Sequence, residues 1–240
     1  MDEELDLSNH GLSRLPPDLF QRISLKRLNL YQNQLAVIPA EIMRLSALEV
    51  LILANNRLVS LPEEFGALVS LSTIDLGHNH LSDLPESFGR LTGLTDYLYL
   101  HDNLLHELPE PAIEGLIKLR YLNLGDNPLR QLPTSMGALA NLEELRLENI
   151  GLQSLPKWIG GMSRLDELSL RNNKLTSLPE SLAALGCLTR LDLRGNCFEA
   201  YPGVLAELPR LRKLDLRWNN PLTVPEWLDK LRIRGCRVLL

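Results

Sequence analysis

The segment LKRLNLYQNQL, residues 25–35, returns as LEVLILANNRL at 48–58 and as LSTIDLGHNHL at 71–81. The same pattern, LxxLxLxxNxL, occurs again as LRYLNLGDNPL at 119–129, LDELSLRNNKL at 165–175 and LTRLDLRGNCF at 188–198. Self-similarity at a fixed period of about 20 to 50 residues is the sequence signature of a repeat architecture. This unit therefore indicates that the chain is a repeat protein.

The ninth position of the unit shows how regular the array is. Successive units are 23 residues apart, except for two steps of 24 that lead into and out of Asn103. Each unit is followed by an apolar residue and a proline, as in Leu15–Pro16. We therefore predict about ten repeats in one domain over residues 1–240, with a capping repeat at 1–24 and a degenerate closing repeat at 222–240. The residues at the ninth position are His10, Asn33, Asn56, Asn79, Asn103, Asn127, Ile150, Asn173, Asn196 and Asn219.

These repeats resemble the leucine-rich repeat family, in its class with the 23-residue consensus LPxxΦxxLxxLxxLxLxxNxL. The resemblance implies an α/β solenoid: a curved arc with a parallel sheet on its concave face and short α-helical or 3-10 segments on its convex face. It also implies a protein-binding function. The class is common in intracellular and in bacterial proteins, whereas bacterial effectors with a 20-residue LPxLP unit match this period less well.

The alternation within the unit assigns its faces. Leu28 and Leu30 should point into the core, and Asn29 and Tyr31 should point out of the sheet. Stacked units share one core, because a single strand cannot bury its leucines alone. The ninth-position asparagines, eight in number from Asn33 to Asn219, are expected to form a ladder of side chains that bond to backbone groups of adjacent turns.

Three places depart from the pattern. Ile150 interrupts the asparagine ladder, so nearby backbone groups need water or other residues as partners; it is either a flexible point or a tolerated substitution. At the N-terminus Asp2 stands at the first leucine position and gives a polar strand. At the C-terminus Arg234 falls where a core leucine belongs, and we expect a last strand with Cys236 buried.

An aromatic group is the first candidate binding site. Tyr97, Tyr99, His101 and Tyr121 fall at outward positions of two adjacent repeats, and Tyr31, Val50 and Ile52 extend the group toward the N-terminus. Gly77 and Gly125 flank it and are expected to leave room for a ligand. One extra residue precedes this strand, between Leu94 and Leu98 in GLTDYLYLHDNLL, which predicts a bulge at the strand entry. Tyrosines are frequent hot spots of protein interfaces, but cross-strand packing alone is the alternative.

A column of arginines is the second candidate. Arg171, Arg194 and Arg217 occupy the seventh position of three successive repeats, with Arg146 and Trp218 nearby. Such a column suits an acidic peptide or a phosphate group. Asp192, Asp215 and Glu148 lie close in the pattern, so mutual pairing on a solvated face is an equal alternative.

Catalysis and metal binding find little support. His78, Asp102 and Asp126 share the eighth-position row, but no loop supplies the six to eight oxygens that Ca²⁺ requires. Cys197 has no histidine in its own or adjacent repeats, and no phosphate-binding loop or hydrolase motif is present. We therefore expect no enzyme, no metal and no cofactor.

Charge and composition limit the partners. The net charge of −5 argues against nucleic acid, and no apolar run is long enough to cross a membrane. Residues 1–120 carry a net charge of −8 and residues 121–240 a net charge of +3, which would orient a partner of opposite polarity. The acidic start MDEELDLSNH has no secretory h-region, and the three cysteines show no CxxC spacing. A cytoplasmic location is expected; secretion by a bacterial route without a signal peptide is the alternative.

The sequence thus predicts a monomeric, non-catalytic scaffold that binds a protein partner on its concave face, in intracellular signalling. Two alternatives stay open. One is a bacterial effector or virulence-associated protein that acts in a host, and the other is a structural or engineered repeat scaffold without a dedicated ligand. The two long units, Ile150 and the uneven charge argue against an idealised design.

Overall fold

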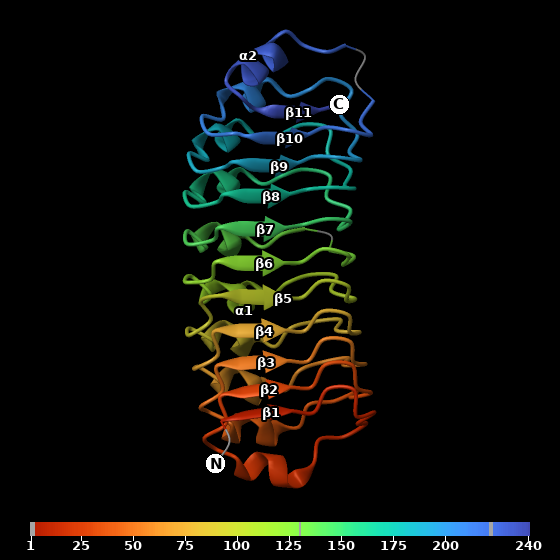
Figure 1. Cartoon of the computed structure of the whole chain (residues 1–240), viewed down its shortest axis with the longest axis vertical. Coiled ribbons are helices and arrows are strands. Elements are labelled where there is room, and N and C mark those ends of the chain that lie inside the picture. The colour runs from red at the N-terminus through yellow and green to blue at the C-terminus, as the bar shows by residue number, and fades with distance from the viewer. Residues whose placement is uncertain (1–2, 130, 221–222) are drawn as a thin grey trace.

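Short parallel strands, stacked one above the other, form a single sheet in this computed structural model (Figure 1). The structure describes residues 3–129, 131–220 and 223–240, and in these ranges the sheet has eleven strands. Each strand pairs with the next one along the chain, so the order in space is the order in sequence. The sheet is open and uncurled, and the two ends of the chain lie at opposite ends of the stack (Figure 1).

The strands are three residues long and are centred on the second leucine position of each unit, as Leu28 is in Arg27–Asn29. Their leucines alternate as predicted: Leu28 and Leu30 are buried, Asn29 is half-buried and Tyr31 is exposed. The strands are β1 (Glu4–Asp6), β2 (Arg27–Asn29), β3 (Val50–Ile52), β4 (Thr73–Asp75), β5 (Tyr97–Tyr99), β6 (Tyr121–Asn123), β7 (Glu144–Arg146), β8 (Glu167–Ser169), β9 (Arg190–Asp192), β10 (Lys213–Asp215) and β11 (Arg237–Leu239).

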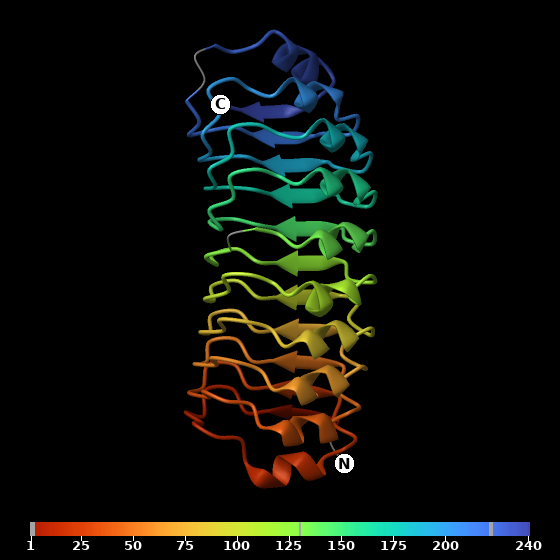
Figure 2. The ribbon, with the colours of Figure 1, turned by 180° about the vertical axis from the view of Figure 1, so that it is seen from behind.

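Short helical turns cover the opposite side of the sheet and stand in front of it in Figure 2. Each one follows a proline. Before the 3-10 turns this proline is itself extended, and it has no backbone N–H, which would have no partner at the start of such a turn. The 3-10 turns are η1 (Pro17–Gln21), η2 (Ala40–Arg44), η3 (Glu63–Ala67), η4 (Glu86–Arg90), η5 (Thr134–Ala138), η6 (Lys157–Gly161), η7 (Glu180–Ala184) and η8 (Gly203–Glu207). The α-helices are α1 (Glu110–Glu114) and α2 (Trp227–Ile233).

Helix α1 replaces a 3-10 turn in one of the two long units. Regular units reach the next buried leucine six residues after the proline, whereas seven residues separate Pro109 from Leu116. The additional residue is accommodated at Gly115, where α1 ends in the right-handed region. The second long unit is longer at its strand entry, which is described with the candidate site.

The ninth-position asparagines bond to the backbone of two adjacent units. The side-chain amide of Asn56 donates to the carbonyl oxygens of Leu30 and Leu53, both at 2.9 Å. Its side-chain oxygen accepts from the Leu35 N–H at 3.0 Å. A buried turn would otherwise leave these groups without partners, so each asparagine joins its own unit to the preceding one.

Ile150 replaces these bonds by apolar packing. Its side chain is buried, and no described residue accepts a hydrogen bond from the Leu129 amide, which the missing asparagine would have bonded. The Leu147 carbonyl keeps one donor, the Asn173 side chain at 2.7 Å. The interruption therefore removes only individual hydrogen bonds of the ladder, and the position stays packed. This favours a tolerated substitution over a flexible point.

The C-terminal register differs from the sequence prediction. Lys213 lies opposite Arg237, an offset of 24 residues, so Arg234 does not occupy a core position. It is exposed after α2, and its guanidinium donates to the Ala206 carbonyl oxygen at 2.7 Å. Cys236 is buried, as expected. The predicted caps at 1–24 and 222–240 include residues outside the described ranges, Asp2 among them.

Candidate functional site

Five aromatic rings touch one another on the outward face of strands β4 to β6, here called the strand face. Tyr99 contacts Tyr121 with ring centroids 4.8 Å apart, and Tyr97 contacts both, at 6.0 and 5.5 Å respectively. His101 follows at 6.1 Å from Tyr99, and His78 at 4.7 Å from His101. We call these five residues the aromatic cluster. His78 was not part of the predicted group, since its position in the eighth row concealed its contact with the next strand.

The extra residue at the entry of β5 sets the register of the cluster. In a regular unit the amides of Ser72 and Thr73 share one acceptor, the Glu49 carbonyl oxygen. In the unit after the long one, the equivalent amides have separate acceptors. The Arg120 N–H donates to the Thr95 carbonyl oxygen at 3.1 Å, and the Tyr121 N–H donates to the Asp96 carbonyl oxygen at 3.0 Å. The added acceptor is the backbone signature of a bulge, and it leaves Tyr97 directly opposite Tyr121.

The cluster combines exposed rings with a partly buried floor. Tyr97 is 47% exposed, while Tyr99 and Tyr121 are half-buried. Burial, followed by the charge of Asp75, raises the pKa of Tyr99, and burial raises the pKa of Tyr121 to about 12. The hydroxyls of Tyr99 and Tyr121 are therefore protonated at neutral pH and able to donate hydrogen bonds.

His101 completes the floor as a neutral ring. Burial, and then the nearby His78, lower its pKa below the ordinary value of histidine. Burial also raises the pKa of the Asp75 carboxyl beside it. The prediction that Gly77 leaves room for a ligand is wrong, because a Cβ at Gly77 would lie 2.4 Å from the His101 ring. At Gly125 the space is likewise limited, with the Glu148 carboxylate 3.1 Å from such an atom.

Three predicted members lie apart from the cluster, of which Val50, in β3, is half-buried and lies opposite Thr73. Tyr31 is 38% exposed on the same face, at the end of β2, but β3 and β4 separate it from β5. Ile52, in β3, is half-buried and also has Asp75 rather than an aromatic ring opposite it. The structure therefore brings together Tyr97, Tyr99, His101 and Tyr121 but not the extension toward the N-terminus.

A hollow of 590 Å³ borders the cluster on the side where the strands begin. Tyr97 and Tyr121 form one wall, and the rest is mostly charged side chains, among them Glu144 of β7, Glu167 of β8 and Arg190 of β9. Two of its arginines are engaged: Arg120 donates two hydrogen bonds to Glu143, at 3.0 and 2.9 Å, and Arg190 lies 2.7 Å from Glu167. Sequence reasoning missed this hollow, although the carboxylates at the second and third positions of two successive units signalled a polar depression.

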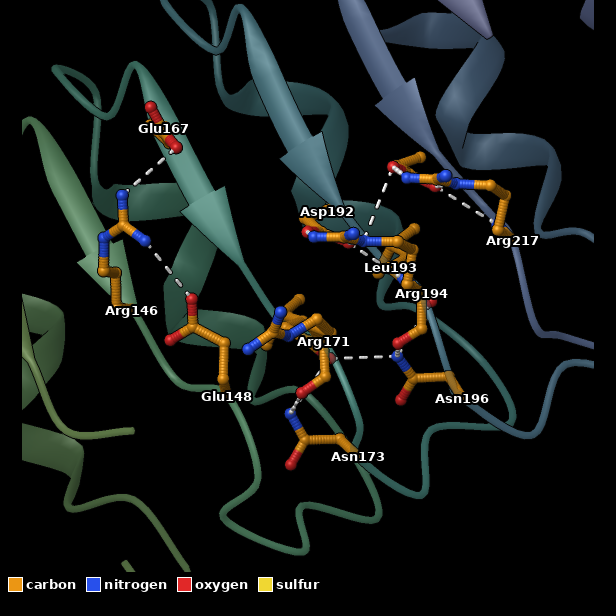
Figure 3. Close-up of polar contacts among 12 residues, drawn as sticks. Arg146, Glu148, Glu167, Arg171, Asn173, Asp192, Leu193, Arg194, Asn196 and Arg217 are labelled. Atoms are coloured by element: carbon orange, nitrogen blue, oxygen red, sulfur yellow. Dashed lines mark hydrogen bonds and ion pairs between the residues drawn. The ribbon is translucent and has the colours of Figure 1, made fainter. Parts of the chain in front are cut away.

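Most arginines of the predicted column are paired with carboxylates (Figure 3). Arg146 lies 2.5 Å from Glu144 and 3.6 Å from Glu167. Arg194 pairs with Asp192 and lies 3.4 Å from Asp215. These pairs favour the mutual-pairing alternative, and they are worth little stability because the arginines are partly exposed.

The other two arginines behave differently from each other. Arg217 lies 2.7 Å from the nearly inaccessible carboxylate of Asp215. Burial alone would raise the pKa of Asp215, but hydrogen bonds from Arg217 and the charge of Arg194 hold it below its usual range. Arg171, by contrast, has no carboxylate partner among the described residues, and it stands between Glu148 and Arg194 in the column (Figure 3).

The eighth-position row is explained by backbone conformation. Its residues have φ between 51° and 57°, the left-handed region that favours asparagine, aspartate and glycine, in Asn55, His78, Asp102, Asp126, Asn149 and Asn172. His78 and Asp102 share a hydrogen bond of 2.5 Å. Within residues 3–129, 131–220 and 223–240, no three metal-binding side chains gather. We therefore explain the residue types of this row by the left-handed conformation of the turn after each strand.

Trp218 is the exception in this row. It has a φ of 61° and is 68% exposed, and the guanidinium groups of Arg217 and Arg194 lie 5.5 and 5.8 Å from its ring. A bulky residue in the left-handed region is strained by about 1–2 kcal/mol. Strained, exposed aromatic residues are candidates for function, since their strain is not offset by core packing.

The strain at Trp218 can be measured by comparing two replacements. Trp218→Asn should be more stable than Trp218→Ala by about 1 kcal/mol, because both remove the ring but only asparagine tolerates the left-handed backbone. Urea denaturation of both variants would give the difference. Equal stabilities would show that the backbone at this position carries no strain.

In the described part of the chain, no helix has the length and apolar character needed to cross a membrane.

A family model described as "Leucine-rich repeat region" matches residues 98–232, and one described as "Leucine rich repeat" matches residues 3–58 and 46–96. No curated protein sequence matches the chain.

Solved structures give the same picture. A leucine-rich repeat protein of Leptospira interrogans superposes over 98% of this chain with a TM-score of 0.91 and 32% sequence identity. A TDR receptor superposes over 98% of this chain with a TM-score of 0.84 and 27% identity. The chain spans 65% of the first structure and 42% of the second.

Proposed function

The chain belongs to the leucine-rich repeat family, and we propose that it is a non-catalytic module that binds a protein partner on its strand face, with the aromatic cluster as the main contact. Domains of this family generally mediate protein–protein interactions, and the family is typically non-enzymatic. The strand face is the surface that the sequence predicts to be concave.

One observation carries the proposal: contacting rings gathered at the surface of a chain in which aromatic residues make up only 5%. Tyrosine side chains bury much area in an interface and lose little rotamer freedom. Tyr97 is 47% exposed, so an approaching protein would remove a large apolar area from water. The hollow beside Tyr97 and Tyr121 would admit a side chain of the partner.

A cytoplasmic location and a role in signalling belong to the same proposal. All three cysteines are free, which suits a reducing compartment. The second candidate is a bacterial protein that uses the same binding surface on a host partner; the similarity to a leucine-rich repeat protein of Leptospira interrogans supports only its bacterial origin. A secretion assay would separate the two candidates, because the binding chemistry is common to both.

The test uses affinity capture from a lysate of the native organism, followed by affinity measurement with the retained protein. Tyr97→Ala and Tyr99→Ala should each weaken binding by roughly 30-fold, which corresponds to a hot-spot loss of about 2 kcal/mol. Ile117→Ala is the matched control, since Ile117 is 48% exposed but belongs to the loop after α1. Retention that is the same for both tyrosine variants and for the unmodified chain would place the partner elsewhere.

A further inference from the structure

Three cations lie in one row where the last strands begin. Lys213 of β10 is directly opposite Arg190 of β9 and Arg237 of β11. Neighbouring strands are about 4.8 Å apart, and like charges directly opposite one another destabilise a sheet. Arg190 is offset by Glu167 at 2.7 Å, but Lys213 and Arg237 have no carboxylate partner among the described residues.

More unpaired cations surround this row. Arg210, Arg212 and Arg234 line a hollow of 550 Å³ at the same edge of the sheet. All three are exposed, and none of them forms an ion pair in the described residues. We call Arg210, Arg212, Lys213, Arg234 and Arg237 the basic edge. The guanidinium of Arg234 is held in place by its hydrogen bond of 2.7 Å to the Ala206 carbonyl.

The acidic side chain at this hollow is already engaged. Asp166 is the one carboxylate among the residues lining the hollow, and it accepts a hydrogen bond of 2.5 Å from Thr189 and lies 3.8 Å from Arg190. In units farther down the sheet the same positions are balanced, as Arg120 with Glu143 and Arg27 with Glu4 show. The excess of positive charge is therefore local to β10 and β11.

We propose that the basic edge binds an acidic segment of a partner protein. The proposal goes beyond the aromatic cluster, because it assigns a second contact surface and a chemistry to the partner. Guanidinium groups bind carboxylates through paired hydrogen bonds, and the hollow offers three of them around one space. A short acidic segment fits better than a nucleic acid, whose long phosphate track would meet the net charge of −8 of residues 1–120.

A defined peptide probe tests the surface without the native partner. The probe is a labelled eight-residue peptide of alternating glutamate and alanine, titrated with the full chain and followed by fluorescence anisotropy at low and at high salt. Lys213→Glu should weaken its binding on the order of tenfold, because the change reverses one charge at the centre of the edge. Higher salt should weaken binding to the unmodified chain.

Two controls separate this proposal from general charge effects and from the aromatic cluster. Arg57→Glu makes the same charge change at an exposed arginine of an N-terminal unit and should alter the peptide affinity less than twofold. Tyr99→Ala should leave peptide binding intact even though it is expected to weaken partner binding at the cluster by roughly 30-fold. An equal loss in Lys213→Glu and Arg57→Glu, no measurable peptide binding, or tighter binding of a single-stranded RNA of equal charge would overturn the proposal.

Discussion

Gly115→Ala is expected to lower the free energy of unfolding by about 3 kcal/mol, because the added methyl group has no room between two stacked units. A Cβ at Gly115 would lie 1.8 Å from the carbonyl oxygen of Gly89 in η4, a backbone atom that cannot swing away. Gly115 has φ −84° and ψ −8°, which alanine adopts freely, so the whole cost is steric. Urea denaturation followed by circular dichroism would measure the loss.

The control for this substitution is Gly186→Ala. A Cβ at Gly186 meets nothing within 4 Å, so that variant should keep the stability of the unmodified chain or gain a few tenths of a kcal/mol. Because each unit contacts only its neighbours, the Gly115 variant should also unfold less cooperatively, with the units on either side of the contact separating first. A loss below about 1 kcal/mol in Gly115→Ala would show that η4 and α1 move apart at little cost.

Asn103→Ala should cost about as much, through hydrogen bonds rather than packing. The Asn103 side chain donates to the carbonyls of Leu76 and Leu100 at 3.0 and 3.1 Å, and accepts from the Leu81 N–H at 2.9 Å. Its removal leaves buried backbone groups of two units without this partner, at about 1–3 kcal/mol for each group that water cannot reach. We expect a total loss of about 3 kcal/mol in denaturant unfolding.

A second asparagine provides the comparison for Asn103. Asn141 makes one solvent-exposed hydrogen bond, from its side-chain amide to the Ile117 carbonyl at 2.8 Å. Asn141→Ala should therefore cost less than about 1 kcal/mol. If both variants lost the same small amount, water would be satisfying the ladder carbonyls, as it can at the protein surface, and the buried ladder would contribute little.

The sequence predicts most of the fold because each unit repeats the same local instructions. Leucines at alternate positions define the inward face, and proline begins each turn, so the eleven described strands follow in one sheet. The C-terminal unit escaped this reasoning. Its helix α2 has seven residues where the other turns have five, and one residue more is needed before β11 pairs with β10. A period inferred from other units does not report such a change.

The candidate site was predictable only in part, because side-chain contacts depend on rotamers that a pattern does not encode. The columns place Tyr97, Tyr99 and Tyr121 on one face, yet they do not show that the His101 ring fills the space over Gly77. They also do not show which arginines find carboxylates. Arg146 reaches across to Glu167 of the next strand, while Arg171 finds no partner in the described chain.

The left-handed backbone of the eighth-position row has a consequence for how such a surface can vary. A position held at φ near 55° tolerates few residue types. In this chain the row consists almost entirely of asparagine, aspartate, glutamine, histidine and glycine. That column can carry little information about a partner. The specificity for a partner must therefore come from residues in the neighbouring columns, where the backbone is extended and any side chain is permitted. Trp218 is the exception to these residue types, and it is therefore the residue of this row that says most about a partner.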